Sequence, residues 1–136
     1  MTRQEAREEL RSYRKLVDIM QNRSIRIEQL RTRLYSMKGV MFKDLPKGNS
    51  NKYYIEELMD KLAKAEREYS DAVWDAESKA KKIIRKLERL PPTYYKVLHK
   101  IFIEGKSYRW AAAELHYGIT SIGNIVKRGI AKYEKL

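Results

Sequence analysis

The sequence contains no cysteine, only three prolines and no long hydrophobic run. Without cysteine, the chain has no disulfide framework, no thiolate metal site and no cysteine nucleophile. No stretch approaches the ~20 consecutive apolar residues that a membrane-spanning helix needs. The first residues also lack the apolar segment of a signal peptide. We therefore expect a cytoplasmic protein that does not bind membranes.

Positive charge is in clear excess. The 136 residues include 30 lysines and arginines against 18 aspartates and glutamates, a formal net charge of +12, and the hydrophobic content of 43% is too high for a disordered basic tail. Residues 1–50 hold 12 basic and 6 acidic side chains, residues 51–90 hold 10 and 9, and residues 91–136 hold 8 and 3. Such an excess predicts a polyanionic partner.

Residues 2–38 contain neither proline nor glycine and predict one long helix. Thr2 followed by Glu5 has the spacing of a capping box at its start, and Gly39 is expected to end it. Apolar side chains recur at three- and four-residue steps, with Ser24 in the one gap. They are Leu10, Tyr13, Val17, Met20, Ile27, Leu30, Leu34 and Met37.

A loop is expected over residues 39–50, and a second helix over Asn51–Leu90. Two long helices joined by a short loop predict an antiparallel hairpin. The two apolar stripes either pack only on each other or also form an interface between copies. A two-helix hairpin has little core of its own, which favours a homodimer or higher homo-oligomer. The second stripe comprises Ile55, Leu58, Leu62, Ala65, Tyr69, Ala72, Ala76, Ala80, Ile83, Leu87 and Leu90.

The sharpest boundary is Leu90-Pro91-Pro92, because a residue before proline is pushed out of the helical region. Three short helices are expected to follow. The first has its apolar face at Tyr94, Val97, Leu98, Ile101 and Phe102, and the second covers residues 108–115 and is capped by Ser107. The last begins at about Ile119, with Ile122, Val126, Ile130 and Tyr133 facing inward. The small Ala112 at the junction, with Ile122 ten residues on, predicts a helix-turn-helix. The expected fold is all-α: a helical hairpin over residues 1–90 and a helix-turn-helix module over residues 91–136.

The outward face of the last helix carries short polar residues followed by cations, as expected of a helix that enters the major groove of double-stranded DNA. We expect Thr120, Asn124 and Lys127 to contact bases; Asn124 has the donor and acceptor that pair with adenine. Lys106, Arg109, Ser121 and Arg128 are the expected phosphate contacts. Whether cations of residues 1–37 also contact DNA is left open.

Several short motifs after residue 89 carry a family resemblance. They are Leu90-Pro91-Pro92, Val97-Leu98, the run from Glu104 to Tyr108, Ala112, Leu115, Thr120-Ser121-Ile122, Val126-Lys127-Arg128, Ile130 and Tyr133. This stretch of about 46 residues resembles the fourth conserved region of bacterial sigma factors. Together with the long charged N-terminal arm, it is similar to small phage late-gene transcriptional regulators of Gram-positive bacteria, the ArpU/RinA-like group. The resemblance implies sequence-specific regulation of transcription in a bacterial host, with host RNA polymerase as a possible partner.

One residue departs from that pattern. Gly123 stands where such modules usually place a long base-reading side chain. Glycine costs a helix ~1 kcal/mol relative to alanine, and Gly129 adds a second weak point.

No residue pattern predicts catalysis, a cofactor or a metal site: the two histidines, His99 and His116, have no acidic residues at ligand spacing, and no glycine-rich phosphate loop is present. We therefore expect a protein that is not an enzyme. Two alternatives to a transcriptional regulator remain. One is a phage terminase small subunit that delivers DNA for packaging, and the other is a sigma mimic that binds RNA polymerase.

Overall fold

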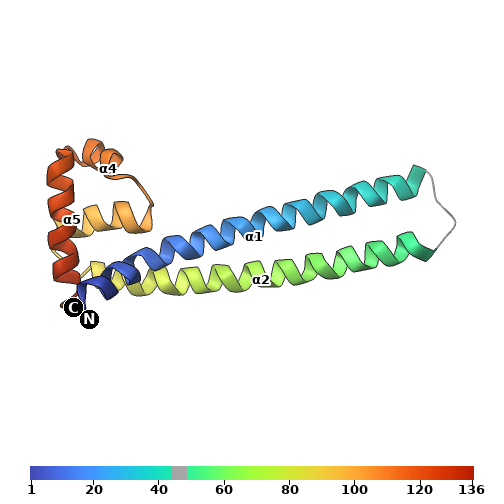
Figure 1. Cartoon of the computed structure of the whole chain (residues 1–136), viewed down its shortest axis with the longest axis horizontal. Coiled ribbons are helices and arrows are strands. Elements are labelled where there is room, and N and C mark those ends of the chain that lie inside the picture. Colours follow the sequence, from blue (N-terminus) through green and yellow to red (C-terminus); the bar gives the residue numbers. More distant parts are fainter. Residues whose placement is uncertain (44–48) are drawn as a thin grey trace. The chain divides into compact units, whose positions relative to one another are not determined.

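The computed structural model describes the backbone of residues 1–43 and 49–136 and the side chains of residues 1–37 and 52–136. Over this part of the chain the protein is all-helical, as predicted. The elements are α1 (Arg3–Lys43), α2 (Asn49–Leu87), α3 (Pro92–Leu98), the π-helix η1 (His99–Ile103), α4 (Tyr108–Leu115) and α5 (Ile119–Tyr133) (Figure 1).

The start of α1 is as predicted, but its end is not. The Glu5 amide donates to Thr2 Oγ1 at 3.2 Å and the Thr2 amide donates to Glu5 Oε2 at 3.4 Å, which is a capping box. The helix continues through Gly39 to Lys43. A single glycine costs only ~1 kcal/mol in a helix interior, too little to stop a long helix. Of the loop expected over residues 39–50, residues 39–43 and 49–50 are helical instead, and residues 44–48 lie outside the described residues.

The second long helix is shifted relative to the prediction. α2 runs over Asn49–Leu87 instead of Asn51–Leu90. Its end is a tightened turn, in which the amides of Arg89 and Leu90 donate to the carbonyls of Lys86 and Leu87 at 3.1 and 3.0 Å. Residues 91 and 92 then begin α3 with proline in its first turn, where the missing amide costs nothing.

The chain forms two compact units. One is Asp18–Trp74, the distal part of the hairpin. The other combines Met1–Val17 with Asp75–Leu136, so the first turns of α1 and the last turns of α2 pack with the C-terminal helices. The expected division into a hairpin over residues 1–90 and a DNA-binding module over residues 91–136 remains a prediction.

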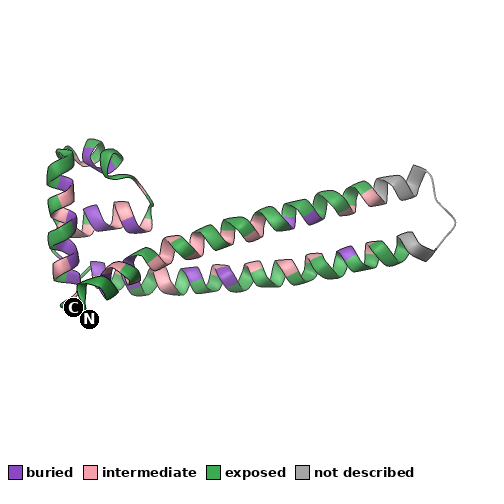
Figure 2. Cartoon of the chain, viewed as in Figure 1, coloured by how far each residue is buried: buried purple, intermediate pink, exposed green. Residues whose placement is uncertain are grey.

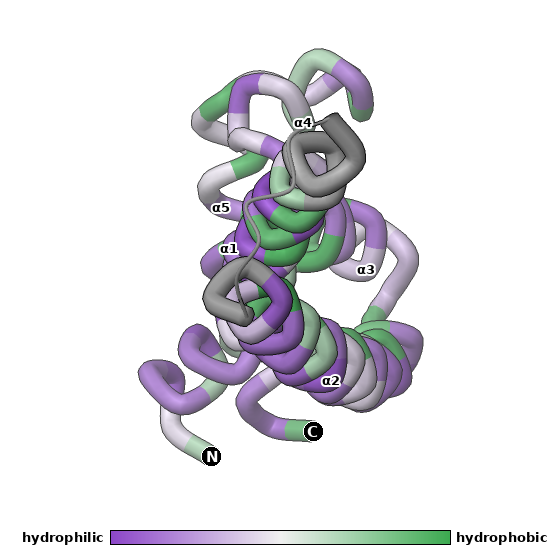
Figure 3. The backbone as a smooth tube through the Cα atoms, turned by 90° about the vertical axis from the view of Figure 1, so that its right-hand side faces the viewer, coloured by the Kyte–Doolittle hydropathy of each residue, from purple (hydrophilic) through white to green (hydrophobic). Residues whose placement is uncertain are grey.

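In the unit Asp18–Trp74, α1 and α2 run antiparallel and bury the predicted stripes, with Ile27, Leu30, Leu58 and Ala72 least exposed (Figure 2). Both helices contain hydrophobic and hydrophilic residues intermixed (Figure 3). Arg31 connects the helices through an ion pair with Glu66 at 3.3 Å, and the guanidinium of Arg23 donates to the Glu68 carbonyl at 2.7 Å. These exposed contacts add little to the apolar packing.

The unit formed by residues 1–17 and 75–136 has one continuous core. Every apolar position predicted to face inward after residue 90 is buried or half-buried there. Ala6, which was not predicted as core, is fully buried at the start of α1. The fully or nearly fully buried core residues are Ala6, Leu10, Ile83, Leu87, Leu90, Val97, Leu98, Phe102, Ala112, Ile122, Val126, Ile130 and Tyr133.

The helix predicted to follow Pro92 changes geometry halfway along. After α3, the π-helix η1 ends where the Glu104 amide donates to the His99 carbonyl at 3.0 Å. Gly105 then adopts a φ of +73°, a conformation that favours glycine. A Cβ on Gly105 would lie 2.6 Å from Arg14 Cζ, whose guanidinium donates to the Ile103 carbonyl at 3.4 Å. Arg14 thus places a cation at the C-terminal end of η1.

Candidate nucleic-acid interface

Two short helices, α4 and α5, are connected by a three-residue turn. The Trp110 amide donates to Ser107 Oγ at 3.1 Å, the N-cap predicted from sequence. α4 ends at His116, whose φ is +60°, and the Tyr117 amide donates to the Ala112 carbonyl at 2.9 Å. A left-handed residue after the last helical turn reverses the chain direction, so α5 begins at once after Gly118.

Small side chains line the contact between the two helices. Ala111 is fully buried and Ala112 is 4% exposed on α4, while Ile122 of α5 is fully buried in the same core. These contacts assign one face of α5 to the interior. The opposite face is therefore available to a partner.

The three expected base-contacting residues lie together on that outward face. Thr120, Asn124 and Lys127 are all exposed, at successive steps of four and three residues along α5. Residues at these steps share one side of a helix. Asn124 therefore lies one turn after Thr120, as a base-reading pair requires.

The expected phosphate contacts are all accessible to some degree. Arg109, Ser121 and Arg128 are exposed, and Lys106 is half-buried. The Lys106 ammonium lies 4.4 Å from the centroid of the Trp110 ring, a cation–π contact that orients it.

The two glycines of α5 have different surroundings. A Cβ on Gly123 would have no atom outside the adjacent backbone within 4 Å. A Cβ on Gly129 would lie 2.9 Å from Leu98 Cδ1 and 3.4 Å from Tyr94 Cδ1. Gly129 thus allows α3 and α5 to approach closely, a role that its helix propensity does not reveal, while Gly123 leaves the outward surface open.

A polar junction that the sequence analysis missed anchors the end of α5. Tyr133 Oη donates to Glu9 Oε2 at 3.1 Å, and Lys86 Nζ contacts both oxygens of Glu9 at 3.1 and 2.9 Å. Lys86 also lies 5.4 Å from the centroid of the Tyr133 ring. The sequence signal was the inward position of Tyr133, whose hydroxyl needs a partner when buried.

The two ends of this hydrogen bond titrate away from their ordinary values. Burial raises the pKa of Glu9, but hydrogen bonds from Lys86 and Tyr133 and the charges of Lys86 and Lys82 outweigh it, so its net pKa is lowered. The pKa of Tyr133 is raised, first by burial and then by the charge of Glu9 and the hydrogen bond to it. The junction is thus held as a carboxylate and a neutral phenol.

Positive charge is concentrated in one unit. The unit of residues 1–17 and 75–136 contains 19 lysines and arginines and 9 aspartates and glutamates, a net +10, whereas residues 18–74 contain 11 and 9, a net +2. The candidate interface on α5 therefore belongs to the unit that attracts polyanions.

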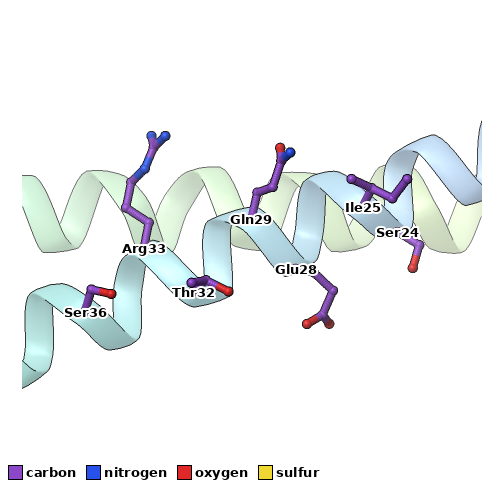
Figure 4. Close-up of a pocket in the computed structure, with 7 residues that line it drawn as sticks. All are labelled: Ser24, Ile25, Glu28, Gln29, Thr32, Arg33 and Ser36. Carbon is purple, nitrogen blue, oxygen red and sulfur yellow. The ribbon is translucent and has the colours of Figure 1, made fainter.

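Two surface hollows differ in charge. A groove along the last turns of α2 is lined by Ser78, Lys81, Lys82, Arg85, Lys86 and Arg89. The sequence analysis missed it because the even charge balance of residues 51–90 conceals a local excess. The hollow along α1 (Figure 4) has Glu28 and Arg33 as its only charged lining residues, which balance, beside Ser24, Ile25, Gln29, Thr32 and Ser36.

The two histidines have local structural contacts. His99 Nδ1 lies 3.2 Å from Glu104 Oε2, and the His99 ring stacks on Tyr95 at 5.5 Å.

Across the described residues, no three histidine or acidic side chains cluster as metal ligands would. No helix in the same part of the chain is long and apolar enough to cross a membrane.

Comparison with known proteins gives no assignment. No protein-family model matches the chain, and no match was found among curated proteins or solved structures.

Proposed function

We propose that this protein binds duplex DNA in a sequence-specific manner through α5 and regulates transcription. The observation that carries the proposal is the exposed face of α5, where Thr120, Asn124 and Lys127 lie opposite a fully buried face. That face belongs to the unit with a net charge of +10. The resemblance of residues 90–136 to sigma region four supports the same function and suggests activation of phage late genes.

The proposed contacts follow from side-chain chemistry. The Asn124 amide can donate and accept at once, which matches the major-groove edge of adenine. Thr120 is close to the start of α5, and the first residues of a recognition helix reach the base edges. Lys106, Arg109, Ser121 and Arg128 would contact phosphates, which set the position of the helix along DNA.

Self-association would place two such modules on one DNA molecule. Large apolar side chains remain exposed in the unit Asp18–Trp74: Ile25 at 56%, Tyr35 at 75%, Met59 at 49% and Trp74 at 69%. Exposed apolar groups of this size are typical of surfaces that bind partners. We therefore propose a homodimer or higher homo-oligomer, in which linked modules bind more tightly than one alone.

The experiment selects a binding site from random duplexes and then compares wild type with Asn124→Ala on the selected and scrambled sites. Loss of the base contact should cost ~1–3 kcal/mol on the selected site and little on the scrambled one. Asn22→Ala makes the same change at an exposed position of α1 and serves as the control. Equal weakening on both duplexes, or none, would contradict base reading by α5.

The mass of the native assembly tests the regulatory role. A monomer or dimer that shifts a promoter fragment agrees with the proposal. A closed ring of eight or more subunits would instead indicate a terminase small subunit. Binding to RNA polymerase without any shift of DNA would indicate a sigma mimic.

A further inference from the structure

The groove along the end of α2 is lined by one serine and five cations. The lining residues form two adjacent rows with steps of four, residues 78, 82 and 86 and residues 81, 85 and 89, and so occupy one side. Ile83 and Leu87, both fully buried, lie on the other side. From residue 78 to the end of α2 at Leu87 the groove follows about 14 Å of helix, and Arg89 lies in the turn that follows. Its lining residues are Ser78, Lys81, Lys82, Arg85, Lys86 and Arg89.

Two of the five cations form ion pairs with a single carboxylate of the same unit. Lys86 Nζ lies 2.9 Å from Glu9 Oε2, and Lys82 Nζ lies 3.6 Å from Glu9 Oε1. The Glu9 side chain is only 11% exposed. Glu9 therefore restrains the ammonium groups of both lysines.

The other three cations have no such partner. Lys81, Arg85 and Arg89 are exposed and form no ion pair with any described residue. They stand four residues apart in sequence. Lys81 and Arg85 lie about 6 Å apart along α2, and Arg89 is in the turn that follows the helix. Like charges four residues apart on a helix repel one another and destabilise it. A bound anion would remove that repulsion.

The charge is also segregated along α2. Residues 49–74 contain 4 basic and 6 acidic side chains, whereas residues 75–90 contain 6 and 3. The basic part is the one that belongs to the same compact unit as α5. An ordinary solvated helix would mix the two signs along its length.

We propose that the groove binds the phosphate backbone of duplex DNA through Lys81, Arg85 and Arg89, as a second contact beyond α5; this rests on the proposed DNA-binding function. The groove adjoins the C-terminal end of α5, because its lining residue Lys86 lies 5.4 Å from the Tyr133 ring centroid. Arg128, an expected phosphate contact, is five residues before Tyr133 on α5. A lipid surface fits less well, since no apolar residue lines the groove and an interfacial helix needs an apolar face.

The test replaces all three residues with glutamine, which removes the charge and keeps a long polar side chain. Lys81→Gln, Arg85→Gln and Arg89→Gln are combined in the full chain, and affinity for a random duplex of about 20 base pairs is measured against salt concentration. The duplex need not be the cognate site, because phosphate contacts supply non-specific binding. The control combines Lys52→Gln, Lys64→Gln and Arg67→Gln, three exposed cations of α2 in the unit Asp18–Trp74. Circular dichroism melting verifies that both variants fold.

If each residue contacts one phosphate, the groove variant should lose roughly 0.9 from the slope of log K against log[salt] per contact, about 2.7 in total. Its affinity near physiological salt should fall by at least about tenfold, and the control should match wild type. An unchanged slope and affinity in the groove variant, or an equal loss in the control, would overturn the proposal.

Other outcomes separate the groove from the proposed function. If the groove variant keeps wild-type affinity while Asn124→Ala loses discrimination, the groove assignment is wrong and the function stands. If the groove variant weakens but wild type discriminates no sequence, the groove stands and the sequence-specific function fails. Wild-type binding to phosphatidylserine vesicles but not to DNA, lost in the groove variant, would overturn the DNA assignment in favour of a membrane.

Discussion

Tyr133 Oη donates a hydrogen bond to Glu9 Oε2 at 3.1 Å, and 124 residues separate the two in sequence. This bond connects the last turn of α5 to the beginning of α1. Lys86 of α2 contacts the same carboxylate, so three helices meet at one partly buried charge. The orientation of α5 within its unit therefore depends on a residue at the opposite end of the chain.

Replacing Glu9 with glutamine should destabilise the protein by about 1–3 kcal/mol, because Lys86 loses its counter-charge in a partly buried site. Thermal or urea unfolding at neutral pH measures the change. Glu8→Gln, one residue earlier and exposed, should stay within about 0.5 kcal/mol of wild type. A Glu9→Gln protein as stable as wild type would show that the junction contributes no net stability.

The same carboxylate predicts how stability changes in acid. The pKa of Glu9 in the folded protein lies below its ordinary value of 4.5, so near that pH the unfolded chain binds more protons. Its stabilising effect is complete above about pH 4.5 and is lost as pH falls through the lower, folded-state pKa. The stability of Glu9→Gln should therefore fall less steeply than wild type below pH 4.5. Parallel curves would exclude Glu9 as a source of acid sensitivity.

At alkaline pH, ionisation of Tyr133 determines how the stability of this junction changes. Because the pKa of Tyr133 is raised above its ordinary value of 10.0 in the folded protein, its effect is complete below pH 10 and declines as pH rises further. Tyr133→Phe should cost about 1 kcal/mol at neutral pH through the lost hydrogen bond. The difference between wild type and Tyr133→Phe should then shrink above pH 10. Tyr35→Phe, at an exposed tyrosine, is the control.

Alanine at the two glycines of α5 should have opposite effects. Gly123→Ala should stabilise the protein by up to ~1 kcal/mol, since the new methyl group meets open space. Gly129→Ala would press against buried Leu98, and overpacking of this kind costs ~1–3 kcal/mol, more than the gain in helix propensity. Unfolding of both variants measures the contrast. Equal stabilisation would mean that Leu98 moves aside at no cost.

The extent of the DNA-binding unit can be tested by shortening the hairpin. Residues 90–136 alone should not fold stably, because Leu10, Ile83 and Leu87 belong to the same core. A chain in which a short glycine-rich loop joins Val17 to Asp75 keeps those residues and should fold. Cooperative melting of the shortened chain, and its absence in the fragment, would support this; a well-folded fragment would contradict it.

Local pattern was enough to predict much of this structure. Helical periodicity predicted both stripes of the hairpin, and short-range chemistry predicted the caps at Thr2 and Ser107. Predictions based on local sequence rules failed at two places. Gly39 lies inside α1, and the chain after Leu98 adopts a π-helix.

The long-range features could not be predicted in this way. Glu9 looked like any charge on a solvated face, because nothing near it in sequence shows that Lys86 and Tyr133 approach it. The role of Gly129 depends likewise on Leu98 of another helix. For the candidate interface, the sequence suggested seven residues between Lys106 and Arg128, and their role stays a prediction. The groove on α2 was missed because the charge was averaged over forty residues.

The compact unit built from Met1–Val17 and Asp75–Leu136 also determines the order in which the protein can fold during synthesis. Leu10 is synthesised 123 residues before Tyr133 (133 − 10), with which it shares a core. At ~5–20 residues per second, translation of residues 75–136 takes roughly 3–12 s. Contacts between residues so distant in sequence also form slowly. Because residues 18–74 are made before α5, the unit Asp18–Trp74 can form while α5 is still being synthesised.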